Sequence, residues 1–396
     1  MNYYLMQISL AGWCAFGTAF AAVLYLLIFM LPRILRVVHR ADLDNEEQEV
    51  PQNGLPPLSV IVYAETGASG LRRLIPQIFS QEYAAPVEVI VVNDENSEAA
   101  ANVVNELQLT YPDLYLTFNP GHSRNLSRRK LALTIGIKAA HHDCLVLTCG
   151  NCSINSPLWL RSIARHFVNG CDMVIGYATL LNDSGNDTGK ARRRRAFDRL
   201  FTSVRWLSSA IAGKVARGTG YNLAYTRQLF FSHKGFANSL GLYAGDDDVF
   251  VAELASTANC AVELSGESIV EVHDYDPVYQ QRMDSISRVF TSRFLPQGGF
   301  RLFGSFSFAW WIWLAASAAT VGFTIPSFIG IIAVAVLAAL LIIPIVWAWR
   351  RAARTLHIRQ LMLTIPFLSL WHPLYTLRYR LRSRKDCRDY CWSGLG

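Results

Sequence analysis

The first 32 residues of the chain contain no charged side chain. Within them, Ile8 to Leu31 are largely apolar, and at about 1.5 Å per helical residue they are long enough to cross a bilayer core of about 30 Å. No basic residue precedes this run, which excludes a cleaved secretory signal, because such signals place basic residues before a shorter apolar core. Arg33, Arg36 and Arg40 follow it instead. The sequence therefore predicts an uncleaved transmembrane anchor over residues 1–32.

Charged residues are scarce in the whole chain, at 17%, whereas 52% of the residues are hydrophobic. Two more uncharged runs, Leu302 to Phe323 and Phe328 to Trp349, are separated by a turn that contains Pro326. They predict a transmembrane hairpin over residues 302–349. Basic residues flank all three runs on one side, so the positive-inside rule places residues 33–301 and the tail in the cytoplasm. The expected location is the inner (cytoplasmic) membrane, as a multi-pass protein.

The carboxy-terminal tail, residues 350–396, is strongly basic. From Arg350 to Asp389 it contains ten Arg or Lys residues against two Asp. Beside a membrane helix, this charge indicates contact with anionic membrane lipids, and we expect no nucleic-acid partner. Its apolar stretch, residues 361–377, is interrupted by two prolines and is expected to be interfacial or re-entrant. A second basic run, "KARRRR" (190–195), indicates a solvated helix start near the bilayer, with phosphate binding as the alternative.

We expect a linker over residues 33–56, because the polar, acidic sequence "ADLDNEEQEVPQNGLPP" has prolines and charges that fit no helix or strand. Over residues 57–301, strand and helix patterns then alternate. Buried β-branched runs such as "LSVIVYA" and "VEVIVVND" alternate with helical patterns such as "GLRRLIPQIFSQEY" and "RKLALTIGIKAAHH". This alternation predicts an α/β fold with a parallel sheet. Ligands bind beyond the carboxyl ends of such strands, which here are followed by Glu65, Asn93, Asp94 and residues 149–151.

Five blocks between Pro57 and Val272 resemble the membrane-bound glycosyltransferases of family 2. They are "PLSVIVYAETG", "VEVIVVNDENSE", "RRKLALTIGIKAAHHDCLVLT", "GTGYNLAYTRQLFFSHKGFA" and "YAGDDDVFVAEL". The resemblance implies a GT-A-like nucleotide-sugar-binding domain with a mostly parallel sheet, joined to one amino-terminal and two carboxy-terminal transmembrane helices. It implies a hexosyltransferase of polysaccharide biosynthesis in the cell envelope, with a nucleotide-sugar donor and a lipid-linked or glycan acceptor.

The same resemblance assigns roles to residues. Asp247 in "GDDD" is the expected catalytic base, with Asp246 beside it, because a carboxylate must take the proton from the acceptor hydroxyl. Asp94 is expected to hold the nucleotide, together with Glu65, Asn93 and Lys130. Asp94 and the "GDDD" aspartates also have a structural alternative, since aspartates cap helices and form turns.

A divalent cation, Mg2+ or Mn2+, is expected from the family, but its binding loop is altered here. Where the family has Thr-Asp-Ala-Asp-Cys, this chain has Thr148-Cys149-Gly150-Asn151-Cys152. A thiol and a neutral amide replace two carboxylates, so only Asn151 is left as a weak metal ligand beside Cys149. The resulting CxxC also allows a redox pair or half of a zinc site, but the surrounding blocks do not resemble a thioredoxin, and no second cysteine pair lies at a suitable spacing.

Other positions depart from the family in the same direction. Glu65-Thr66-Gly67 stands where the family has Arg-Asn-Glu, Tyr221 replaces an arginine, and of the membrane-proximal Gln-x-x-Arg-Trp motif only Arg288 is a candidate. Two hypotheses therefore stand. The chain is either an active transferase with an altered metal site or a non-catalytic relative that supports a partner protein in the membrane.

Overall fold

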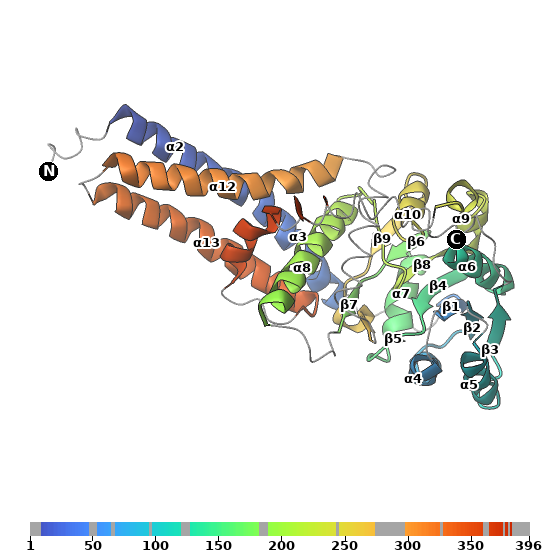
Figure 1. Cartoon of the computed structure of the whole chain (residues 1–396). Coiled ribbons are helices and arrows are strands. Elements are labelled where there is room, and N and C mark those ends of the chain that lie inside the picture. The colour runs from blue at the N-terminus through green and yellow to red at the C-terminus, as the bar shows by residue number, and fades with distance from the viewer. Residues whose placement is uncertain are drawn as a thin grey trace. The chain divides into compact units, whose positions relative to one another are not determined.

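The computed structural model describes residues 9–46, 54–64, 68–94, 97–119, 127–181, 189–242, 245–273, 298–324, 328–358, 364–374, 377–378 and 381. The chain falls into two compact units. The first comprises residues 1–38, 188–208 and 297–378, and the second comprises residues 39–187, 209–296 and 379–396. Figure 1 labels their elements.

The first unit contains the apolar helices. Three helical segments are long and apolar enough to cross a membrane: Leu10–Glu46, Gly304–Thr324 and Ile329–Thr355. They confirm the expected one amino-terminal and two carboxy-terminal helices. The first segment joins α2 (Leu10–Tyr25), a π-helical turn (Leu26–Met30) and α3 (Leu31–Glu46), and the others belong to α12 (Gly298–Thr324) and α13 (Ile329–Thr355). Helix α2 packs along α12, where the hydroxyls of Tyr25 and Ser305 lie 2.5 Å apart.

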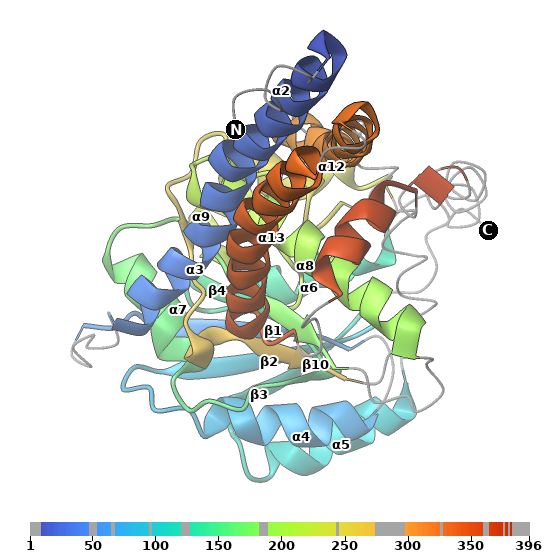
Figure 2. The same ribbon diagram turned by 90° about the vertical axis from the view of Figure 1, so that its left-hand side faces the viewer.

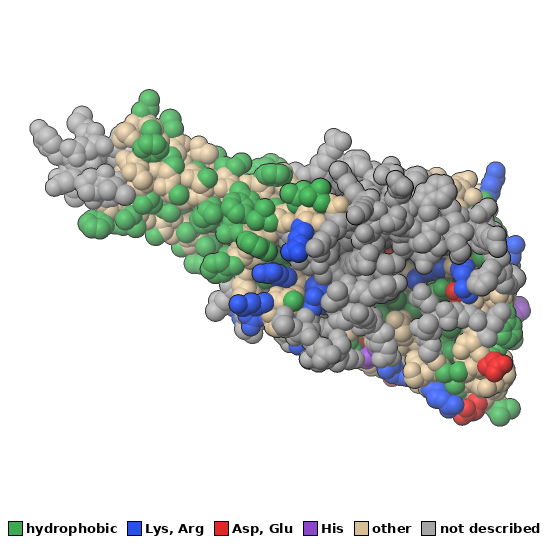
Figure 3. All heavy atoms as spheres, in the orientation of Figure 1, with side chains coloured by type: hydrophobic (Ala, Val, Ile, Leu, Met, Phe, Trp, Pro, Cys, Tyr) green, Lys and Arg blue, Asp and Glu red, His purple; other side chains and the backbone are tan. Residues whose placement is uncertain are grey.

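Large apolar side chains remain exposed on these helices, as expected for a lipid-facing surface. Trp13, Ile28, Phe308, Ile332 and Ile343 are each more than half exposed. Figure 3 shows hydrophobic side chains over α2, α12 and α13. The basic run 190–195 lies in the first turns of α8 (Gly189–Ile211), so its prediction as a helix start is confirmed.

A buried aromatic cluster packs α8 against α13 and the helix formed by residues 365–374. The His372 ring lies 4.4 Å from the Phe201 ring and 5.7 Å from the Phe197 ring, and Trp349 contacts both phenylalanines. The His372 Nε2 atom is 3.1 Å from the Asp198 carboxylate, and both residues are buried. The apolar stretch with two prolines therefore contains a helix held by specific contacts.

The second unit is built on a seven-stranded sheet with the strand order β3-β2-β1-β4-β8-β6-β9. Its strands are β1 (Leu58–Ala64), β2 (Val87–Asn93), β3 (Leu114–Phe118), β4 (Cys144–Cys149), β6 (Met173–Ile175), β8 (Leu223–Thr226) and β9 (Cys260–Val262). Strand β8 is antiparallel to both of its neighbours, and the other pairs are parallel. Every residue of β1 and β4 is buried, which explains their continuous apolar sequences.

The helices between the first four strands follow the expected alternation. They are α4 (Ala68–Phe79), α5 (Glu98–Gln108) and α6 (Arg128–Ala139), and Figure 2 shows α4 and α5 together along one face of the sheet. The hydroxyl groups of Ser97 and Ser127 cap the first turns of α5 and α6. Gly136 lets α6 approach β1 and β2 closely, since a Cβ atom there would lie 2.8 Å from methyl groups of Ile61 and Val92.

A second, three-stranded sheet has the order β5-β10-β7, formed by β5 (Cys152–Ser153), β10 (Val270–Val272) and β7 (Ala178–Leu180). Among its described residues, this unit also contains the helices α7 (Trp159–Val168), α9 (Arg227–Ser232) and α10 (Val249–Leu254). The pairing of β5 with β10 ties the end of the "TCGNC" loop to residues 270–272.

Two boundaries differ from those expected. The polar segment after Arg40 continues α3 as far as Glu46, because Asp44 is fully buried, pairs with Arg40 one turn earlier and accepts a hydrogen bond from the Leu264 backbone. Composition alone does not reveal these tertiary contacts. In addition, residues 188–208 belong to the unit that contains the apolar helices, although they lie within the range 57–301 expected for the α/β domain.

Candidate active site

The carboxyl ends of β1, β2 and β4 place the predicted site residues at one edge of the sheet. The Asp94 amide donates to the Ala64 carbonyl at 3.2 Å, and the Gly150 amide donates to the Tyr63 carbonyl at 2.8 Å. The turns that follow β2 and β4 are therefore both fastened to the end of β1. This is the position expected for a ligand site in an open α/β sheet.

Asp94 is buried, and neighbouring side chains orient its carboxylate. Its carboxylate accepts from the Tyr63 hydroxyl at 2.8 Å and from the Asn119 amide at 2.5 Å, and Arg128 Nε lies 3.4 Å from it. Arg128 also donates to the Asp94 carbonyl at 2.6 Å. Ser97, and not Asp94, caps α5. The alternative role of Asp94 as a helix cap is therefore excluded, and its carboxylate is oriented by three side chains.

Asn93 and Glu65 are two other residues that were predicted to contact the nucleotide. Asn93 is buried, and its side chain bonds the Ser97 backbone through both its amide and its oxygen, at 3.0 and 3.1 Å. Asn93 therefore stabilises the turn that presents Asp94. Glu65 lies outside the described residues, as do Thr66 and Gly67.

Arg129 connects the Asp94 region to the acidic cluster. Its guanidinium lies over the Tyr63 ring, 5.1 Å from the ring centroid, and its Nε is 2.8 Å from an Asp246 carboxylate oxygen. Tyr63 in turn bonds Asp94, so a continuous chain of contacts runs from Asp94 through Tyr63 and Arg129 to Asp246. The two acidic groups predicted from the sequence therefore belong to one connected set of contacts.

The three aspartates of "GDDD" have different environments. Asp248 caps α10, whose first amide donates to its carboxylate at 2.6 Å. Burial and the neighbouring Asp246 together raise the pKa of Asp247 to about 7, whereas Arg217 opposes the shift. Asp246 is paired with Arg129. Capping therefore falls to Asp248, and Asp247 has a pKa suited to accepting a proton near neutral pH.

Lys130 is completely buried beneath the acidic cluster. Its amine donates to the backbone carbonyls of Ser239 at 2.7 Å and of Leu242 at 3.2 Å. Burial lowers the pKa of Lys130 to about 8, although the charges of Asp246 and its neighbours oppose this shift. Lys130 holds the segment that leads into "GDDD", and its predicted contact with the nucleotide stays a prediction.

The altered loop after β4 lacks the ligand set of a divalent cation. Cys149 is buried, and its sulfur lies 3.7 Å from both the Gly220 carbonyl and an Arg129 nitrogen. The Asn151 amide donates to the His273 carbonyl at 3.3 Å. Mg2+ and Mn2+ require several hard oxygen ligands, and a divalent cation about 4 Å from a guanidinium is repelled by about 8 kcal/mol at an effective dielectric constant of about 20. The residues at this loop therefore do not fit the expected ion.

The CxxC does not have the properties of a redox pair. Cys152 is fully buried, and this burial raises the pKa of its thiol to about 11. Reactive thiols have lowered pKa values instead. Both cysteines are free thiols in the structure.

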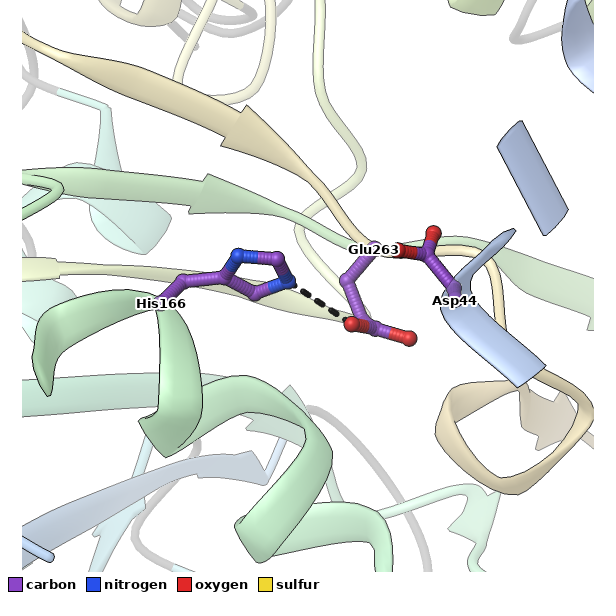
Figure 4. Close-up of side chains that lie close together, drawn as sticks. All are labelled: Asp44, His166 and Glu263. Atoms are coloured by element: carbon purple, nitrogen blue, oxygen red, sulfur yellow. Dashed lines mark hydrogen bonds and ion pairs between the residues drawn. The ribbon is translucent and has the colours of Figure 1, made fainter. Parts of the chain in front are cut away.

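A separate group of metal-ligating residues lies where α3, α7 and the end of β9 meet. Asp44, His166 and Glu263 are buried, with one potential ligand atom of each within 4.8 Å of the others (Figure 4). Arg165, however, lies 3.0 Å from Asp44 and 2.5 Å from Glu263, and so supplies the positive charge between the two carboxylates. His166 adds a contact of 2.7 Å to Glu263. This group is a buried ion network in which a metal does not fit.

Both carboxylates of this network have shifted pKa values. Burial and the nearby Glu263 raise the pKa of Asp44 to about 6. Burial acts against the ionised form of Glu263, but the hydrogen bond from His166 and the charge of Arg165 keep its pKa below the usual value. Glu263 therefore carries the negative charge that Arg165 balances most directly.

The sequence analysis missed the basic, aromatic and amide partners of the acidic residues, which are Tyr63, Asn119, Arg128, Arg129 and Arg217. One signal was available. Three consecutive basic residues, Arg128 to Lys130, open α6, where positive charge is unfavourable to the helix dipole. Nearby acidic groups can offset this unfavourable charge, and here these groups are Asp94 and the "GDDD" cluster.

Comparisons with known proteins agree with this architecture. The sequence model of the family described as "Glycosyl transferase family 2" matches residues 59–230. The structure is similar to that of the mannosyltransferase PcManGT from Pyrobaculum calidifontis, solved in complex with GDP-Man and Mn2+, with a TM-score of 0.50 and 16% sequence identity. The similarity covers 87% of this chain and 99% of that one. No curated protein sequence matches the chain. Residues 59–230 are therefore similar to glycosyl transferase family 2, and the fold is a GT-A-like α/β fold.

Proposed function

We propose that this chain transfers a hexose from a nucleotide-sugar donor to a lipid-linked or polysaccharide acceptor at the cytoplasmic face of the inner membrane. The observation that carries the proposal is the chain of contacts from Asp94 to Asp246 through Tyr63 and Arg129. This chain of contacts supports the proposal, because it links a buried carboxylate suited to nucleotide recognition with a carboxylate pair suited to proton transfer. The three apolar helices support a membrane location, and the basic residues beside them support the cytoplasmic orientation.

In the proposed reaction, Asp247 accepts the proton of the acceptor hydroxyl. The acceptor oxygen forms a bond to the anomeric carbon of the sugar, and the bond from that carbon to the diphosphate breaks. The nucleoside diphosphate leaves with the bonding electron pair. In this proposal, charged groups of both signs lie around the reacting atoms. They are the carboxylates of Asp246 and Asp247 and the guanidinium groups of Arg129 and Arg217.

The second candidate function is that of a non-catalytic membrane scaffold for a partner protein. The observation that favours it is the loop after β4, where a buried thiol and an amide stand in place of two carboxylates. The two candidates make opposite predictions for nucleotide binding, because a scaffold does not require an intact donor site.

Nucleotide binding by the purified full-length protein tests the proposal. Calorimetric titration should show binding of uridine or guanosine diphosphate, and Asp94→Asn should weaken it by about 10- to 100-fold, because a charge-assisted hydrogen bond to the base is lost. Asp113→Asn, at an exposed aspartate before β3, is the matched control and should bind as the unaltered protein does. The absence of binding for both diphosphates, with and without Mn2+, would favour the scaffold.

A further inference from the structure

The side chain of Arg129 supplies positive charge at the proposed donor site. Arg129 makes two contacts that draw it into the site, one to Asp246 at 2.8 Å and one to the face of Tyr63. A third nitrogen contact, 3.7 Å long, reaches the sulfur of Cys149. Cys149 occupies the position at which the family's metal-binding loop begins, so the guanidinium lies beside the altered metal site.

The surrounding backbone is shaped around this guanidinium. A Cβ atom on Gly220 would lie 2.3 Å from the Arg129 Nη2 atom and 3.4 Å from Asp246. The "GTGYN" loop therefore passes directly over the Arg129–Asp246 pair, and Gly220 leaves the space that the arginine fills. Tyr221 stands where the family has an arginine, and it lies close enough to Arg129 to help raise the pKa of the guanidinium.

Arg129 still has the means to bind an anion. Its side chain is 26% exposed, and a guanidinium carries five N–H donors, of which Asp246 and Cys149 take only part. A planar guanidinium is well suited to phosphate oxygens because it can bind two of them at once. Arg128, 42% exposed and bound to Asp94, adds a second positive group on the side of the nucleotide.

We propose that Arg129 takes over the role of the divalent cation, so that the chain binds the diphosphate of its donor without a metal ion. This inference rests on the proposed function and specifies how the donor is held. The altered residues then form one consistent set. The Cys149 thiol allows the Arg129 guanidinium to approach, whereas a cation bound to an aspartate at position 149 would repel it. Asn151 then has no metal ion to bind.

Calorimetry with and without chelation tests the inference. The full-length protein should bind uridine or guanosine diphosphate with the same affinity, within about twofold, in excess EDTA and in Mn2+. Arg129→Met should weaken binding in EDTA by about 10- to 100-fold, as expected for loss of a charge-assisted contact, and Arg129→Lys should restore part of it. Arg72→Met is the matched control, since Arg72 pairs with Glu106 on the exposed surface of α4 and α5.

The outcomes separate the inference from the function on which it rests. Binding that requires Mn2+, or that strengthens tenfold or more with it, would overturn the inference and leave the transferase proposal standing. The absence of binding under both conditions would overturn both. If Arg129→Met does not fold, the EDTA comparison on the unaltered protein still decides. Mn2+ titration followed by electron paramagnetic resonance gives a second readout, in which the unaltered loop should bind no ion and Cys149→Asp combined with Asn151→Asp should gain binding.

Discussion

Asp247→Asn should lower the turnover of sugar transfer by about 100- to 10,000-fold, the usual contribution of a general base. The carboxylate accepts the proton of the acceptor hydroxyl, and a neutral amide cannot do so. Nucleotide affinity should remain nearly unchanged, because the base acts on the acceptor. Asp172→Asn, at a carboxylate that bonds the Asn259 backbone away from the site, is the matched control. Unchanged turnover in Asp247→Asn would remove Asp247 from this role.

The pH dependence of the unaltered protein follows from the same residue. Burial, Asp246 and Asp248 raise the pKa of Asp247 to about 7, so the carboxyl is largely protonated below this pH. Only the ionised form accepts a proton. Turnover should therefore rise as the pH increases from about 6 to about 8, with a midpoint near 7. A profile that is flat across this range would show that another group is the base.

Arg165→Leu should destabilise the domain by about 3–5 kcal/mol, the usual cost of removing one partner from a buried ion network. Arg165 contacts both Asp44 and Glu263, and its loss leaves two buried carboxylates with less compensation. His166 and Arg40 remain as partial partners. Thermal or denaturant unfolding of the purified protein measures the effect.

The control for this prediction is an ion pair on the surface. Arg72→Leu breaks the exposed pair with Glu106, which contributes at most about 1 kcal/mol. If Arg165→Leu costs no more than Arg72→Leu, the buried network does not stabilise the fold as described. The network also joins the end of α3 to α7 and to the residues that follow β9, so its loss should release the end of α3, which lies within the expected linker.

The sequence predicted the elements of the fold well, for identifiable reasons. The buried strands β1, β2 and β4 are largely apolar runs, α4 and α5 have apolar periodicity, and serine hydroxyls cap α5 and α6. These signals are local in the chain. The end of α3 was missed because its stability comes from Arg165 and Leu264, which are distant in sequence.

The sequence suggested part of the candidate site. Asp94 and the "GDDD" cluster were predicted because acidic residues after buried strands stand out, and because their blocks resemble a family. Their connection through Tyr63 and Arg129 was not predicted, since no local pattern pairs Arg129 with Asp246. Asn93 looked like a ligand contact because it ends a strand, yet its side chain closes the following turn. The sequence thus identified unusual residues, whereas their partners required the structure.

The most direct measurement is an experimental structure of the full-length protein with the nucleoside diphosphate that it binds in calorimetry. The account predicts the base beside Asp94, the diphosphate against Arg129, and the Asp247 carboxylate facing the position of the transferred sugar. A nucleotide bound elsewhere on the domain, or a diphosphate out of reach of Arg129 and Asp247, would contradict it.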